Sequence, residues 1–71
     1  MAEKHIGPLL PASHFKVWSK NCRTLRIHAA NMIEVFGDRQ LTRYDVLHQV
    51  NKWNELSAHN EDCLWMYWLE D

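Results

Sequence analysis

Three residue types that interrupt or cross-link a fold are scarce in this chain, which has only two glycines, two prolines and two cysteines among 71 residues. So little glycine and proline excludes a collagen-like or low-complexity chain. Two cysteines cannot build the dense disulfide framework of small secreted domains. We therefore expect reduced thiols, with one bridge between Cys22 and Cys63 as the alternative.

Long apolar runs are also missing. The longest, Cys63 to Leu69, has seven residues, whereas a transmembrane helix needs about 20. The N-terminal apolar stretch is broken by Gly7, Pro8 and Pro11, so it lacks the continuous core of a secretory signal. The sequence therefore predicts a soluble, cytoplasmic protein without a membrane partner.

Charge of one sign is not in excess, since 8 Lys and Arg face 9 Asp and Glu for a net charge of −1. With 46% apolar residues, this balance excludes an intrinsically disordered chain. We expect one domain over residues 1–71, of marginal stability because a domain of about 60 residues buries only about 60% of its unfolded surface.

The strongest periodic signal is an apolar series spaced alternately by three and four residues. Its members are Phe15, Trp18, Cys22, Leu25, Ala29, Met32 and Phe36. This spacing predicts one long helix over residues 14–36, capped by Ser13 and ended by Gly37. Pro8 and Pro11 predict an extended arm over residues 1–13.

A second helix is predicted over residues 43–57. Thr42 is its expected N-cap, and Asp45 completes an approximate capping box. Leu41 and Val46 occupy the two positions of a hydrophobic staple.

A short third helix is predicted over residues 61–69, with Asn60 as its cap and Glu61 and Asp62 in its first turn. The segment is apolar on both sides whether it forms a helix or a strand. The predicted fold is therefore an all-α, three-helix domain with an extended N-terminal arm, residues 14–71 forming the helical core.

Residues 32–53 read MIEVFGDRQLTRYDVLHQVNKW. This stretch resembles the end of the long helix, the loop and the final helix of histone-fold proteins. The resemblance implies a dimerising, nucleic-acid-binding role.

Four tryptophans, at about 150–250 Å² each, are more aromatic surface than so small a helical domain can hide. We therefore predict a non-catalytic regulator, adaptor or inhibitor that binds a protein partner or forms a homodimer. Its predicted apolar anchor is Trp53, Trp65, Met66, Tyr67 and Trp68. An acidic rim of Glu61, Asp62, Glu70 and Asp71 would steer a basic partner.

The alternative function is a nucleic-acid-binding, transcription-regulator-like helical dimer. Lys16, Lys20 and Arg23 would line one face of the first helix. Arg39 and Arg43 would lie at the start of the second helix, where a recognition helix presents side chains to bases.

Metal binding and catalysis have weaker signals. His59 and Cys63 are four residues apart, and Cys22 with His14 or His28 would complete a tetrahedral set. The chain has no paired Cys-x-x-Cys or His-x-x-x-His and no glycine-rich phosphate loop or nucleophile elbow. We expect no metal, cofactor, catalytic residue or small-molecule substrate.

Overall fold

A computed structural model describes residues 7–59 and 64–70 of the chain. The elements in order are β1 (Leu10–Pro11), the 3-10 helix η1 (Ala12–His14), β2 (Val17–Asn21), β3 (Ile27–Ala29), α1 (Met32–Phe36), β4 (Gln40–Leu41), α2 (Arg43–His59) and β5 (Trp65–Leu69). The prediction of an all-α, three-helix domain is wrong. In the described residues, strands form two antiparallel sheets and only α2 is a long helix, so the fold is α+β.

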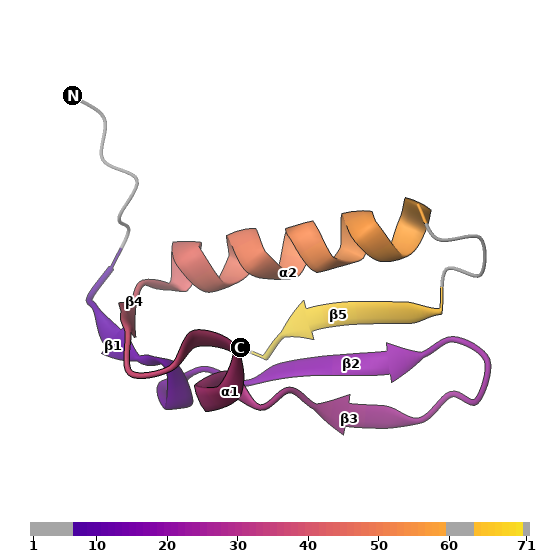
Figure 1. The fold of residues 1–71 in the computed structure, drawn as a ribbon, viewed down its shortest axis with the longest axis horizontal. Helices are drawn as coiled ribbons and strands as arrows, with labels where there is room; N and C mark the ends of the chain where they lie inside the picture. The colour runs from indigo at the N-terminus through magenta and orange to yellow at the C-terminus, as the bar shows by residue number, and fades with distance from the viewer. Residues whose placement is uncertain (1–6, 60–63, 71) are drawn as a thin grey trace.

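The larger sheet has the strand order β3-β2-β5, and both of its strand pairs are antiparallel. Trp18 at the centre of β2 lies opposite Trp68 of β5 and Ala29 of β3. Figure 1 shows α2 beside β5 and running in the opposite direction. The helix thus takes the position at which a further strand would extend the sheet.

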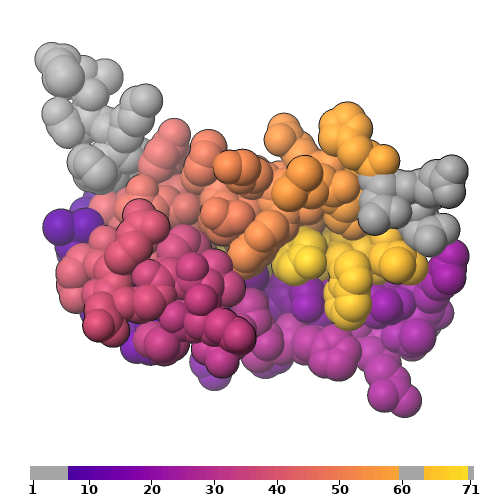
Figure 2. Space-filling view, in the orientation of Figure 1, coloured from indigo at the N-terminus to yellow at the C-terminus, as the bar shows by residue number. Residues whose placement is uncertain are grey.

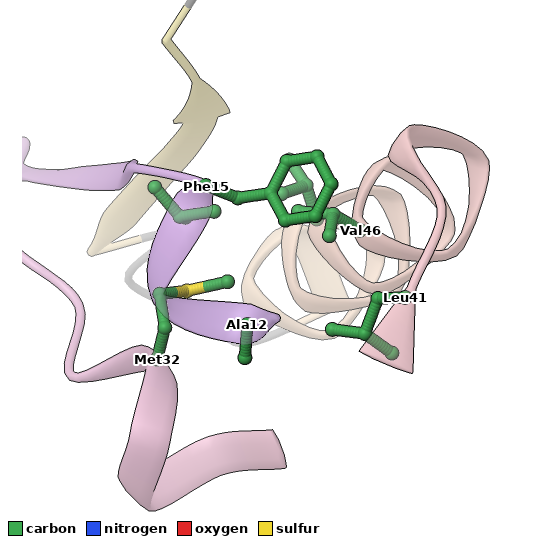
Figure 3. Close-up of a cluster of buried hydrophobic side chains, with 7 residues drawn as sticks. Ala12, Phe15, Met32, Leu41 and Val46 are labelled. Carbon is green, nitrogen blue, oxygen red and sulfur yellow. The ribbon is translucent and has the colours of Figure 1, made fainter. Parts of the chain in front are cut away.

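The hydrophobic core lies at one end of the molecule. There β1 pairs with β4, placing Leu10 opposite Leu41. The core residues come from five elements and from the chain between η1 and β2, and Figure 3 shows several of them converging. They are Ala12, Phe15, Val17, Met32, Leu41, Val46 and Val50. This small core covers the end of the sheet where β2 begins.

The predicted start of the second helix is confirmed. The Thr42 hydroxyl accepts a hydrogen bond from the Asp45 N–H at 3.2 Å, and the Asp45 carboxylate accepts one from the Thr42 N–H at 2.9 Å. This reciprocal pair is a capping box. Leu41 and Val46, the expected staple residues, both lie in the core. The helix therefore begins at Arg43 and continues to His59.

The predicted helix over residues 14–36 is wrong. Burial follows a two-residue period through Phe15, Val17 and Ser19, as a half-covered strand requires. The Asn21 side chain then accepts hydrogen bonds from the N–H groups of Arg23 and Thr24, both at 2.9 Å. These bonds form a local turn. Leu25 completes the turn with a φ of 65°.

Only the last part of that predicted helix is helical. Asn31 accepts a hydrogen bond from Glu34 N–H and caps α1, which ends at Gly37 as expected. Gly37 has a φ of 70°, which glycine adopts at little cost. Since α1 has five residues, the long helix of the histone-fold resemblance is absent from residues 14–36.

The predicted C-terminal helix is also wrong, because Trp65–Leu69 forms β5. All five residues of β5 pair with β2, and the bonds from Cys22 N–H to the Leu64 carbonyl and from Glu70 N–H to the Lys16 carbonyl extend the ladder at both ends. Residues 60–63, including the expected cap Asn60, lie outside the described residues. Pairing with β2 therefore makes this segment a strand and not a helix.

Residues 7–13, the described part of the predicted extended arm, contain β1 and the start of η1. Leu10 packs against the core, while Leu9 remains exposed. None of the helices in the described ranges combines the length and apolar character that a membrane crossing needs.

Candidate functional site

The two faces of the β3-β2-β5 sheet differ in how well they are covered. Residues that lie opposite each other on antiparallel strands point to the same face. Val17 and Ser19 are buried, and they share their face with Leu69 and Tyr67. We call this the core face. The face carrying Trp18 is the opposite one.

The core face also holds an aromatic cluster beyond the core itself. The Trp53 ring of α2 lies 5.2 Å from the Tyr67 ring, and Trp65 meets His28 edge-on at 5.9 Å between ring centroids. Trp53, Tyr67 and Trp65 are all half-buried. In Figure 2, side chains of β5 reach the surface between α2 and β2. The cluster thus joins α2 to the sheet without being enclosed.

The opposite face, which we call the open face, is formed by alternate residues of the three strands. They are Trp18, Lys20, Ile27, Ala29, Met66 and Trp68. No residue of this set is fully buried, and Met66 and Ile27 are 50% and 54% exposed. Trp18 and Trp68 lie side by side at its centre as a cross-strand pair. The result is a patch of large apolar side chains in contact with solvent.

The acidic side chain of Glu70 adjoins this patch. The Trp18 indole N–H donates a hydrogen bond to the Glu70 carboxylate over 2.6 Å. Lys16 precedes β2 in the same alternation as Trp18 and Lys20, so both lysines belong to this side of the strand. The open face therefore has an apolar centre with charges of both signs around it.

The outer edge of β5 is closed by two polar side chains of α2. The Asn54 carboxamide accepts a bond from Tyr67 N–H at 2.8 Å and donates one to the Tyr67 carbonyl at 3.0 Å. The Ser57 hydroxyl accepts from Trp65 N–H at 3.1 Å and donates to the Trp65 carbonyl at 2.7 Å. These side chains replace the hydrogen bonds of a neighbouring strand, so they block edge-to-edge pairing here.

The structure separates the predicted protein-binding residues between the two faces. Trp53, Trp65 and Tyr67 lie on the side of the core face, whereas Met66 and Trp68 lie on the open face. Glu70 adjoins the open face through its bond with Trp18. The remaining predicted rim residues, Glu61, Asp62 and Asp71, lie outside the described residues.

The predicted basic face does not exist as a helical face. Lys16 and Lys20 belong to the β2 region, Arg23 lies in the turn after it, and Arg39 lies between α1 and β4. Arg43 is the first residue of α2, as expected. Lys16 and Lys20 lie on one side of β2 beside the two tryptophans, and Lys16 also lines a hollow together with Arg43 and Glu70.

Sequence reasoning missed four residues of these surfaces. Trp18 was expected on the apolar seam of a helix, and Ile27 was not singled out. Asn54 and Ser57 were also missed, although Ser57 continues the helical stripe of Val46, Val50 and Trp53 with a polar group. A polar residue in an otherwise apolar stripe signals a buried hydrogen bond.

Cysteine and histidine do not converge in the part of the chain that the structure describes, where no three His, Cys, Asp or Glu side chains could hold one metal ion. Cys22, expected on an apolar seam, is an exposed free thiol in the turn after β2. His59 ends α2, and its proposed partner Cys63 falls in the undescribed range 60–63.

No protein-family model, curated protein or solved structure matches this chain. The function is therefore inferred from the surfaces described above.

Proposed function

We propose that this protein is a small non-catalytic protein-binding module that self-associates through the open face of its sheet. The observation that carries the proposal is the pair Trp18 and Trp68 at the centre of that face, with Met66 and Ile27 about half exposed beside it. Aromatic residues and methionine are enriched where protein surfaces meet, and a large exposed apolar patch is typical of an interface.

A second copy of the chain fits this face. In a twofold-symmetric pair the same patch must complement itself. An apolar centre meets an apolar centre, and the surrounding Lys16, Lys20 and Glu70 supply both charge signs for contacts at the rim. Two sheets pack face to face at about 10 Å, a spacing that interdigitated tryptophans fill.

A dilution series of the solution mass, with Met66→Glu as the test variant, addresses the proposal. Wild-type protein is expected to be a dimer that dissociates on dilution. Met66→Glu places a carboxylate in the apolar patch beside the Trp18–Trp68 pair and opposite Lys20, so the dimer would have to bury a charge and the variant is expected to be a folded monomer. Leu56→Glu is the matched control, since Leu56 is 63% exposed on α2, outside the open face.

Two results would overturn self-association. One is a wild-type protein that is monomeric at every concentration while its circular dichroism shows the native fold. The other is equal association of wild type and Met66→Glu, because the interface would then lie elsewhere. Loss of native circular dichroism in Met66→Glu is checked with the milder Met66→Gln, which is still expected to weaken the dimer.

Single-stranded nucleic acid is the second candidate partner, and one observation favours it. Trp18 and Trp68 offer two adjacent stacking surfaces with Lys16 and Lys20 nearby, as in sheets that bind unpaired bases. The Glu70 carboxylate, which is bonded to Trp18, would repel the phosphates of a nucleic acid there. If the protein binds an oligothymidylate in a salt-sensitive way, and Met66→Glu and Lys20→Glu lose this binding, the open face binds nucleic acid and not a second copy of the chain.

A further inference from the structure

The two outer edges of the sheet differ in whether side chains bond to their main-chain groups. Asn54 and Ser57 close the edge of β5, but no side chain within residues 7–59 or 64–70 bonds to the outer edge of β3. Figure 1 shows β3 as the outermost strand on its side of the sheet. The peptide groups on this edge are therefore candidates for binding another strand.

The hydrogen-bonding alternation identifies which groups point outward. Ala30 N–H donates to the Val17 carbonyl and Asn21 N–H donates to the Arg26 carbonyl, with His28 paired opposite Ser19 between them. In an antiparallel pair, the intervening residues direct their N–H and C=O groups away from the partner. The N–H and C=O groups of Ile27 and Ala29 therefore face the outer edge. No residue within 7–59 or 64–70 hydrogen-bonds to them.

Within the described residues, neither a proline nor a bonded side chain protects this edge against strand addition. All three residues of β3 are exposed, and none is proline. Ile27 is 54% exposed and Leu25, just before the strand, is 63% exposed. A bare edge with exposed apolar side chains is a template for an added strand.

The basic residues near β3 determine which kind of strand can bind to its edge. Between residues 4 and 33 the chain has no acidic residue, and Lys20, Arg23 and Arg26 surround the β2–β3 turn. A second copy of β3 would bring no acidic side chain to this edge, whereas an acidic segment would be attracted. The edge therefore disfavours a second copy of the same strand.

A hollow at the other end of β3 adds a second determinant. It has a volume of about 230 Å³ and is lined mostly by Phe15, Val17, Ala29, Ala30, Met32 and Ile33. These side chains suit one apolar side chain of a bound segment. The hollow lies at the Ala29 end of the strand and the arginines lie at the Ile27 end.

From these observations we infer that the β3 edge binds an extended acidic peptide segment of another protein, which adds as a further antiparallel strand. Its main-chain groups bond to Ile27 and Ala29. Because the segment runs opposite to β3, its apolar residue comes first and enters the hollow, and its acidic residues follow beside Arg26. The site uses the outward main-chain groups of Ile27 and Ala29, whose side chains belong to the open face, and peptide binding does not require self-association.

The test uses a labelled synthetic peptide with capped ends, one leucine followed by alternating valine and glutamate, titrated into the full chain by fluorescence anisotropy. Saturable binding is expected, and a lysine-for-glutamate peptide is expected to bind at least about tenfold more weakly. Ala29→Pro removes an outward N–H without touching the ladder to β2 and should weaken binding about tenfold. Ala29→Thr changes the side chain at the same position but keeps that N–H, so the difference between the two variants isolates the contribution of the N–H.

Amide hydrogen exchange gives an independent measurement. Peptide binding is expected to slow exchange at Ile27 and Ala29 while leaving Tyr67 unchanged, since the Tyr67 N–H is already bonded to Asn54. The inference is overturned if no peptide binds, if the lysine peptide binds equally well, or if Ile27 and Ala29 show no added protection. Binding by the Met66→Glu variant separates this site from the dimer, because that variant should lose self-association and keep the peptide.

Discussion

The side chain of Asn54 should contribute to stability out of proportion to its size. It makes two hydrogen bonds with Tyr67, at 2.8 and 3.0 Å, and both are partly buried. A hydrogen bond contributes about 0.5–1.5 kcal/mol net, so Asn54→Ala should lose about 1–3 kcal/mol from this pair. For a domain of this size that corresponds to a fall of about 4–8 °C in Tm for each kcal/mol.

Asn51→Ala is the matched control, because Asn51 is exposed and lies three residues earlier on the same helix. Both substitutions raise helix propensity by up to about 0.7 kcal/mol, so the difference between them isolates the two bonds. Urea unfolding followed by tryptophan fluorescence measures both. If the two variants differ by less than about 0.5 kcal/mol, the β5 edge is not held by Asn54 and our account of it is refuted.

Three further predictions concern the same framework. Ser57→Ala should lower the free energy of unfolding by about 1–3 kcal/mol by removing both bonds to Trp65; urea unfolding checks this. Thr42→Val, which keeps the shape of the fully buried residue but loses the capping hydroxyl, should cost about 0.5–2 kcal/mol, and native-level stability would contradict the capping box. Gly37→Ala should cost about 1–3 kcal/mol from backbone strain alone, because nothing lies within 4 Å of an added Cβ; an unchanged thermal midpoint would argue against the positive φ.

Local signals in the sequence were reliable where the interacting groups are close along the chain. Thr42 and Asp45 are three residues apart, so the start of α2 follows from their side chains alone. Gly37 likewise ends α1 where expected. These features need no distant partner, which is why sequence reasoning finds them.

The segment 14–36 shows the opposite case. Its apolar spacing suits a helix, yet Trp18 pairs across strands with Trp68, which is 50 residues away. The turn at Asn21 was a readable local signal, since its side chain bonds the following backbone. The pairing partner was not readable, because the spacing within one segment carries no information about a strand so far along the chain.

The amino-acid sequence by itself determined the position of α2, the end of α1 and an aromatic C-terminal segment that is apolar on both sides. Only the tertiary structure decided that this segment is a strand and that Trp18 joins Trp68 on the open face. It also decided that Asn54 and Ser57 close one sheet edge, while no described side chain closes the other. The physical reason is that a strand obtains its main-chain hydrogen bonds from other segments. A helix obtains them within itself, and its caps from its immediate neighbours.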